Sequence, residues 1–397
     1  MDIYLVGGAV RDTLLGLPVK DRDWVVVGVS PQHMVALGYV AVGKDFPVFL
    51  HPVSKEEYAL ARTERNSAPG YKGFTVHAAP DVTLEQDLAR RDLTINAIAV
   101  SSDQLDDNGN FDPRSALLDD PFHGRRDLQQ RCLRHVTDAF HDDPVRILRL
   151  ARFAARFADF RVADETLALM RSMVANGDVD ALVAERVWQE LARGLLEDTP
   201  SRMLQELDAC GALSQLLPEL RPIDKQSAIG AGDGLAVTLD RAAAARAPLT
   251  VRFACLGLFI DGEAPLRQVC ERLRAPNDCR GLALLSMRER DAVRDRDALD
   301  AAGLVQLLER CDAFRKPARF AELLQVCAIG ATQDRANGVG KVRASDLMAV
   351  LSAAQSVSTD TIARREMAAG RSGPQIGAAI HAARVAAIDA MQQPGPM

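Results

Sequence analysis

The chain has 397 residues, 48% of them hydrophobic, which is enough for two or three domains with cores of their own. Its 48 basic and 54 acidic side chains leave a formal charge of -6, which excludes a basic nucleic-acid tail and a disordered acidic chain. A polyanionic partner must therefore meet a local basic patch. No secretory signal and no apolar run of about 18 residues is visible, so we expect a soluble protein.

The positions of cysteine and histidine limit which disulfide, metal and proton-transfer sites the chain can form. The seven cysteines are scattered and never spaced as C-x-x-C, which argues against a disulfide framework or a zinc ribbon and fits a reducing cytoplasm. No histidine occurs between His141 and His381. Those 239 intervening residues therefore cannot supply an imidazole to a metal or proton-transfer site.

The sequence predicts an α+β fold. Aromatic and β-branched residues near the start form short runs separated by turn signals, which predict strands at 3–6, 24–27, 47–50 and 58–60. A helical stretch is expected at 10–15. From Asp143 onward the pattern changes to Ala, Leu and Arg at helical spacing. We expect a mixed domain of about 130 residues followed by helices.

A glycine turn follows the first predicted strand. Gly7 and Gly8 precede a helix that carries Arg11 in its first turn. Free backbone N–H groups at a helix start suit a phosphate. Such turns are also common structural features, so this signal is weak when taken alone.

Two carboxylates stand at the start of the second predicted strand. Asp21 and Asp23 are two residues apart, so they would project from the same side of a strand. A divalent cation would relieve their repulsion, and hard oxygen ligands favour Mg²⁺. The alternative is a solvated polar turn, which the neighbouring phosphate-suited turn makes less attractive.

A second basic motif runs from Arg90 through Arg91 and Asp92 to Asn96. An arginine fork can hold a triphosphate, and carboxylate or amide groups can bond ribose hydroxyls. An ordinary surface ion pair would explain this segment equally well if it stood by itself.

The densest signal is an arginine ridge that begins at Asp143 and continues to Phe157. Asp143 reads as the N-cap and Pro144 as the first helical residue. Residues 121–161 hold nine Arg and five Asp, a local excess of four positive charges. The ridge is either a polyanion site or a solvated helix. Asp143 and Arg146 would share a face and could present an acceptor and donors to a base edge.

Four motifs in this order and spacing resemble one family, the class II tRNA nucleotidyltransferases (CCA-adding enzymes) and poly(A) polymerases, and most of all its proteobacterial CCA-adding members. The resemblance is clear over residues 1–220 and fades beyond. The residues that carry it are Gly7-Gly8-Ala9-Val10-Arg11-Asp12, Asp21-x-Asp23, Arg90-Arg91-Asp92-Leu93-Thr94-Ile95-Asn96-Ala97 and Asp142-Asp143-Pro144-Val145-Arg146.

The resemblance implies three parts and one activity. A nucleotidyltransferase-type mixed α/β head would occupy residues 1–137, a helical neck for base selection 138–200, and a helical body and tail for tRNA binding 201–397. The implied activity is template-independent addition and repair of the 3′-terminal CCA of tRNA from CTP and ATP, with release of pyrophosphate. We expect it in the cytoplasm, with no membrane and no obligatory protein partner.

The resemblance also assigns roles by position. Asp21 and Asp23 would be the catalytic residues and hold Mg²⁺. Asp143 and Arg146 would pair with the incoming C or A, while residues 185–190 would brace the neck. The other nucleotide contacts would come from Gly8, Arg11, Arg91, Arg149 and Arg152. Asp92 and Asn96 would lie near the ribose.

Two departures from the family pattern matter. The neck motif begins with Asp142 where the family has Glu, which keeps the charge. Related proteobacterial enzymes often carry an HD phosphohydrolase domain, whose metal site needs histidines that residues 142–380 do not contain. We therefore expect no phosphatase or phosphodiesterase activity, and a helical scaffold in that region.

Other functions remain open at this point. A bacterial poly(A) polymerase shares the core motifs but tends to carry a basic extension, which this chain does not show. Enzymes that add only C-C or only A are a further possibility. A noncatalytic tRNA-binding descendant is the alternative from another class, and the retained Asp21 and Asp23 weigh against it.

Overall fold

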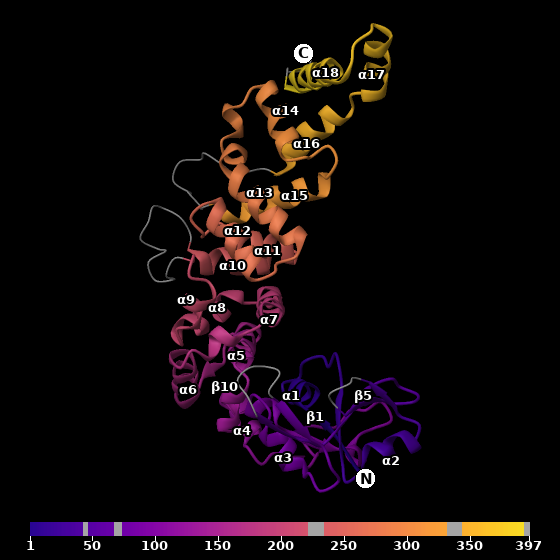
Figure 1. The fold of residues 1–397 in the computed structure, drawn as a ribbon, viewed down its shortest axis with the longest axis vertical. Coiled ribbons are helices and arrows are strands. Elements are labelled where there is room, and N and C mark those ends of the chain that lie inside the picture. The colour runs from indigo at the N-terminus through magenta and orange to yellow at the C-terminus, as the bar shows by residue number, and fades with distance from the viewer. Residues whose placement is uncertain (43–46, 67–73, 221–233, 332–343, 393–397) are drawn as a thin grey trace. The chain divides into compact units, whose positions relative to one another are not determined.

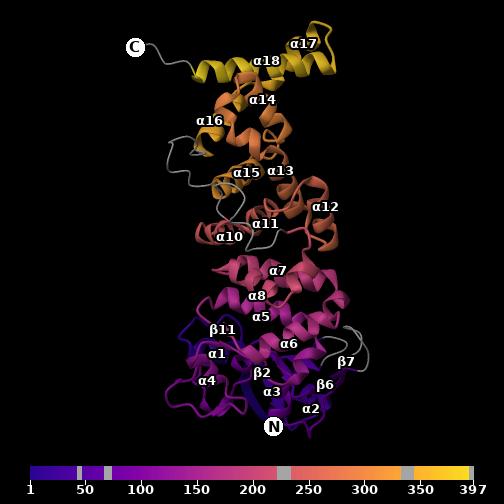
Figure 2. The ribbon, with the colours of Figure 1, turned by 90° about the vertical axis from the view of Figure 1, so that its left-hand side faces the viewer.

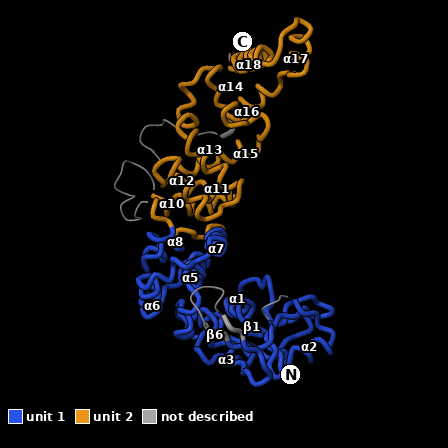
Figure 3. The backbone as a smooth tube through the Cα atoms, viewed as in Figure 1, with its two compact units in different colours: residues 1–194, 202–216 blue, residues 195–201, 217–397 orange. Residues whose placement is uncertain are grey.

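The computed structural model describes residues 1–42, 47–66, 74–220, 234–331 and 344–392. Its backbone contacts divide the chain into two compact units (Figure 3). Unit 1 comprises residues 1–194 and 202–216, and unit 2 comprises 195–201 and 217–397. The head, neck and body boundaries after residues 137 and 200 come from the family resemblance rather than from contacts, and they stay predictions.

Unit 1 is built on a mixed sheet, seven-stranded in the described residues, with the order β3-β4-β5-β2-β1-β8-β9. β2 pairs with β5 in parallel, and its other neighbour, β1, runs antiparallel to it. The four predicted strands are confirmed, each starting within one residue of the expected position, whereas β3, β8 and β9 were not predicted. The strand bounds are β1 Asp2–Val6, β2 Asp23–Val27, β3 Val40–Val42, β4 Val48–Leu50, β5 Glu57–Leu60, β8 Ala99–Ser101 and β9 Leu118–Asp119.

The pairing of β1 with β2 sets the position of the two predicted motifs. Val6, the last residue of β1, lies opposite Asp23, the first residue of β2. Gly7 therefore turns away from the sheet directly beside that carboxylate. Gly7 has φ 68°, a conformation that favours glycine, and a Cβ there would also crowd Nη1 of Arg91 at 3.0 Å.

Short helices accompany the sheet, and longer helices follow it. Strands β10 (Cys132–Leu133) and β11 (Arg161–Val162) form a small parallel pair, and β6 (Thr63–Asn66) pairs with β7 (Phe74–His77). The helices of this part are α1 Gly8–Leu14, α2 Pro31–Ala36, α3 Leu84–Ala89, α4 Gly124–Gln129, α5 Val145–Arg156, α6 Asp164–Ala175, α7 Ala184–Leu196, α8 Pro200–Ala209 and α9 Ala212–Leu216. The 3-10 turn η2 spans Thr94–Asn96.

The start of α5 differs by one residue from the sequence expectation. The helix begins at Val145 with Pro144, not Asp143, as its N-cap. The reason is local: the Asp143 carboxylate accepts the N–H of Val145 at 3.2 Å while its own backbone stays extended. The carboxylate thus serves the helix start from just outside it.

Unit 2 is helical throughout its described residues. Helix α11 packs against α10, α13 and α15, and α18 packs against α14, α16 and α17 (Figures 1 and 2). A mixed sheet in unit 1 followed by helices confirms the predicted α+β class. None of the described helices is long and apolar enough to cross a membrane. The bounds are α10 Leu235–Ala244, α11 Leu249–Gly257, α12 Glu263–Arg272, α13 Asn277–Arg294, α14 Ala301–Arg310, α15 Pro317–Gly330, α16 Ala344–Gln355, α17 Thr359–Ala368 and α18 Gly373–Gln392.

Helix α4 supports the turn that carries Asn96. Gly124 begins α4, and a Cβ at this position would overlap the carbonyl oxygen of Thr94 and crowd the side chain of Ile98. The Thr94 hydroxyl donates to Asp127 of α4 at 2.7 Å. Glycine at position 124 therefore allows α4 to approach η2 closely, and the Thr94–Asp127 hydrogen bond ties the two together.

We predict that Gly124→Ala destabilises unit 1 by about 1–3 kcal/mol, because the added methyl group must displace backbone. The two tryptophans, Trp24 and Trp188, both belong to unit 1, so their fluorescence during urea unfolding reports its stability. Gly281→Ala is the control, since a Cβ there meets open space in α13 of unit 2. Equal fluorescence midpoints for the two variants would contradict the packing argument.

Candidate active site

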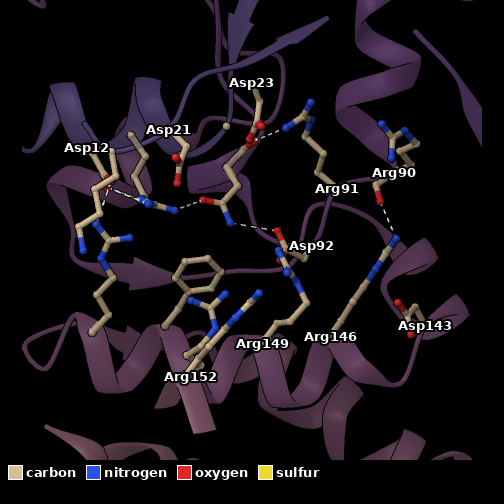
Figure 4. Close-up of a pocket in the computed structure, with 18 residues that line it drawn as sticks. Asp12, Asp21, Asp23, Arg90, Arg91, Asp92, Asp143, Arg146, Arg149 and Arg152 are labelled. Carbon is tan, nitrogen blue, oxygen red and sulfur yellow. Dashed lines mark hydrogen bonds and ion pairs between the residues drawn. The ribbon is translucent and has the colours of Figure 1, made fainter. Parts of the chain in front are cut away.

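One cavity in unit 1 collects the predicted site. Its volume is about 550 Å³, and all eleven residues for which the sequence predicted a catalytic or nucleotide-binding role line it (Figure 4). The lining contains nine cationic and five acidic side chains, a formal excess of four positive charges. The full set is Gly7, Gly8, Arg11, Asp12, Lys20, Asp21, Asp23, Arg90, Arg91, Asp92, Asn96, Asp143, Arg146, Arg149, Arg152, Phe153, Arg156 and Arg193.

Asp21 and Asp23 enter the cavity from the start of β2. Asp23 is the first residue of the strand and Asp21 precedes it, and both are exposed. Within the described part of the chain, neither carboxylate takes part in a hydrogen bond or ion pair. Figure 4 shows both across the cavity from the arginines of α5. These oxygens are available to a ligand from the cavity.

Arg91 is held behind the glycine turn. Its Nη2 pairs with Asp87 at 3.2 Å and its Nη1 donates to the carbonyl oxygen of Asn96 at 3.4 Å. Asp87 is fully buried, and burial alone would raise the pKa of its carboxyl. Arg90 and Arg91 outweigh burial and bring that pKa below its ordinary value. Asp87 is therefore a fixed anion that orients both arginines.

Arg11 lies deeper in the cavity wall than its motif suggested. Only 3% of the residue is exposed. Its Nε donates to Asp12 at 2.8 Å and its Nη1 to Asn96 at 2.6 Å. Burial lowers the pKa of the guanidinium and Asp12 opposes that shift. Arg11 thus reaches the cavity as a cation whose orientation is already set by neighbouring groups.

Asp92 is the most heavily bonded carboxylate of the site. One oxygen accepts from the Asn96 amide at 3.0 Å and from the N–H of Leu93 at 2.9 Å, and the other accepts from Nε of Arg149 at 2.8 Å. Burial would raise the pKa of this carboxyl, but Arg149 and the Asn96 hydrogen bond hold it well below its ordinary value. In turn Asp92 raises the pKa of Arg149.

Glu190 of α7 is a second buried carboxylate that binds arginines of the site. It is 5% exposed and accepts from Nε of Arg152 at 2.7 Å. Its other oxygen lies 3.8 Å from both Nη1 of Arg149 and Nη1 of Arg193. Three guanidinium groups therefore converge on one carboxylate, and α7 orients the arginine ridge of α5.

Asp143 and Arg146 lie side by side at the start of α5, each fixed by the protein. Arg186 of α7 binds Asp143 with two hydrogen bonds, at 3.0 and 2.7 Å. Arg146 donates to the carbonyl oxygens of Ala139 at 2.7 Å and Arg90 at 2.6 Å. Both side chains line the cavity, and Figure 4 shows the guanidinium of Arg146 pointing to the carbonyl group of Arg90.

Several lining residues have no role predicted from the sequence. Asp12 belongs to the glycine motif and Arg156 continues the arginine spacing, but neither pattern predicts their ion pair at 2.8 Å, which joins α1 to α5. Lys20 precedes the aspartate pair, and Arg193 stands three residues after Glu190. Their positions next to known motif residues were the available signal.

Comparisons with known proteins agree with this geometry. The family described as "Poly A polymerase head domain" matches residues 3–134, and "Probable RNA and SrmB-binding site of polymerase A" matches residues 159–223. The "Multifunctional CCA protein" of Variovorax paradoxus is 54% identical, over 98% of this chain and 100% of that protein.

Solved structures share the fold. A CCA-adding enzyme in its apo form II has a TM-score of 0.72 at 21% identity, covering 99% of this chain and 89% of that one. The Thermotoga maritima CCA-adding enzyme complexed with tRNA has a TM-score of 0.66 at 21% identity, covering 99% and 88%. At such identities the likeness concerns the fold alone.

The head sheet and the motif-lined cavity define a nucleotidyltransferase with a head domain of the poly(A) polymerase type. The chain belongs to the family of the multifunctional CCA proteins. The resemblance inferred from the four motifs is thereby confirmed, and with it the nucleotidyltransferase head followed by helices.

We predict that Asp92 makes unit 1 sensitive to acid. Because the pKa of its carboxyl is lower in the folded state than the ordinary value of 3.8, its contribution to stability is present above that pH and is lost as the pH falls toward the folded pKa. Below about pH 4 the urea midpoint from tryptophan fluorescence should therefore fall less steeply for Asp92→Asn than for the wild type. Asp107→Asn, at an exposed head carboxylate, should keep the wild-type slope. Identical slopes for the wild type and Asp92→Asn would refute the assignment.

Proposed function

We propose that this chain adds and repairs the 3′-terminal CCA of tRNA, using CTP and ATP and releasing pyrophosphate. The observation that carries the proposal is the single cavity in which all four family motifs meet. Its excess of positive charge suits a nucleoside triphosphate and an RNA 3′ end together. The Thermotoga maritima enzyme of the same fold, solved with tRNA, supports the RNA substrate.

The donor set at the start of β2 fits Mg²⁺. Asp21 and Asp23 offer exposed carboxylate oxygens without histidine or sulfur, which is the ligand chemistry that this cation prefers. Within the described residues no larger cluster of possible metal ligands occurs, so the remaining coordination would come from water and phosphate oxygens. When bound, Mg²⁺ would supply charge neutralisation at the reacting phosphate.

The chain's own residues would bind and orient the substrates. Gly8 and Arg91 would hold the triphosphate, with Arg11 behind them, and Arg149 and Arg152 of α5, which line the same cavity, would reach it from the other side. Asp21 and Asp23 would face the place where the RNA 3′-hydroxyl must approach the α-phosphate in line with the leaving pyrophosphate. Fixed cations there would stabilise the charge that develops during transfer.

Base selection would rest on the geometry of Asp143 and Arg146. A carboxylate has about four acceptor positions. In Asp143, Oδ1 accepts from Val145 and Arg186 and Oδ2 accepts from Arg186. Oδ2 thus retains an acceptor position for an exocyclic amino group, which cytosine and adenine both present and uracil lacks.

We also propose that the helical region near residues 251–259 lacks HD phosphohydrolase chemistry. In α11 the side chains of Val251, Phe253, Cys255 and Leu256 are buried in a helical core. Such a surrounding offers packing rather than metal ligands. The seven cysteines are free thiols, which supports placing the protein in the reducing cytoplasm.

We predict that purified protein with Mg²⁺, CTP and ATP extends a tRNA ending at the discriminator base to CCA and then stops. Asp21→Ala and Asp23→Ala should each lower this rate by at least about 1000-fold, because both carboxylates serve the same step. Asp107→Ala, at an exposed head carboxylate outside the cavity, is the matched control. Product 3′ ends are read by sequencing.

Any other product of this assay would point to a different activity. Long A tracts would assign a poly(A) polymerase, and ends reading only C-C or only A would assign a partial enzyme. Unchanged tRNA ends would leave the noncatalytic tRNA-binding function. Full activity of either aspartate variant would remove the metal assignment and keep the rest.

We predict that Asp143→Ala loses base selection. With the acceptor gone, discrimination against UTP should fall by about 10- to 100-fold, in line with the energy of one paired base edge. Asp138→Ala, an exposed carboxylate outside the cavity, should behave as the wild type. Single-nucleotide incorporation with each of the four triphosphates measures this. Unchanged discrimination in Asp143→Ala would contradict the assignment.

A further inference from the structure

Phe153 of α5, which lines the cavity, stacks on Phe157, the residue that directly follows the helix. The rings of Phe153 and Phe157 lie one helical turn apart, with centroids 6.2 Å apart and planes 3° from parallel. Both are nearly fully buried. The guanidinium carbon of Arg11, from α1 of the head, lies 5.1 Å from the first centroid and 5.3 Å from the second. One arginine of α1 therefore covers both rings, one on α5 and one just after it.

Two more cations share these rings. Arg152 lies 4.5 Å from the Phe153 centroid, and Arg156 lies 5.2 Å from the Phe157 centroid. Guanidinium groups this close repel each other, and Arg156 contributes to the lowered pKa of Arg11. The electron-rich ring faces offset part of that repulsion before any phosphate arrives.

Asp12 completes the arrangement at the edges of the guanidinium groups. It is 5% exposed, accepts from Nε of Arg11 at 2.8 Å, and accepts from Nη2 of Arg156 at 2.8 Å. The rings thus hold the faces of these cations while the carboxylate holds their edges. The Asp12–Arg156 ion pair and the contact of Arg11 with the Phe153 ring both connect α1 with α5, so the glycine turn before α1 and the helix α5 are held together.

We propose that Phe153 is a positioning residue for the nucleoside triphosphate, acting through Arg11 and Arg152. This inference rests on the proposed nucleotidyl transfer. An arginine side chain has about 2 kcal/mol of rotamer entropy to lose on binding a phosphate. A ring that fixes two guanidinium groups in advance removes part of that loss. Packing alone would require only an apolar group of similar volume at position 153.

The test replaces the ring and keeps the volume. In Phe153→Leu the KM for CTP and for ATP should rise about tenfold, the size expected when two partly buried cation–π contacts are lost. The KM for tRNA and the value of kcat should each stay within about twofold of the wild type. Phe153→Tyr retains a ring face and should restore the KM for both nucleotides.

The matched control is Phe160→Leu. Phe160 is equally buried and packs on Phe157 with centroids 5.1 Å apart, but within the described residues no guanidinium lies over its ring. Tryptophan fluorescence monitors folding of each variant, and Phe153→Met replaces Phe153→Leu if the latter does not fold. Equal nucleotide KM values for the Phe153 and Phe160 variants, or failure of tyrosine to restore KM, would overturn the proposal. If the wild-type protein did not add CCA at all, the proposed function itself would be refuted instead.

Discussion

The buried ion pair between Asp92 and Arg149 is the constraint on which the rest of the site depends. Removing a carboxylate from water costs several kcal/mol unless protein groups replace the lost hydration. Asp92 obtains replacements from its own loop, through Leu93 and Asn96, and from Arg149, 57 residues further along the chain. The loop alone leaves one oxygen without its charged partner. The head therefore reaches its lowest free energy only with α5 packed against it, and that packing closes the cavity.

The same pairing prepares the cavity for a polyanion. The arginines that face it are held by a carboxylate, a carbonyl or a ring, as Arg152 is by Glu190 and Arg146 by Ala139. These contacts fix side chains that would otherwise lose rotamer freedom when a triphosphate binds. Only Asp21 and Asp23 present carboxylates to the cavity without a described partner. The structure thus separates anions that orient arginines from anions that are available to a ligand.

Local patterns predicted much of this arrangement, and long-range pairing accounts for what they left out. Strands β1 and β2 follow from their own β-branched runs. The strand expected to carry both aspartates begins only at Asp23, and Asp21 precedes it. The insertion of β8 beside β1 and the Asp12 to Arg156 ion pair join segments about 95 and 144 residues apart, and no local period encodes such pairings. The one-residue shift at the start of α5 arose because Asp143 bonds Val145 by its side chain.

Helix α11 shows how a region can be kept without metal chemistry. Arg252 is almost fully buried there, and burial lowers the pKa of its guanidinium. It donates to the carbonyl oxygens of Ala247 at 2.8 Å, Leu195 at 2.7 Å and Glu197 at 2.9 Å. Carbonyl groups at the end of a helix lack intrahelical partners, so this guanidinium satisfies the end of α7, the helix that carries Glu190. Loss of the arginine would leave those buried carbonyls unbonded, which is a reason to retain the helix that holds it even when no histidine remains.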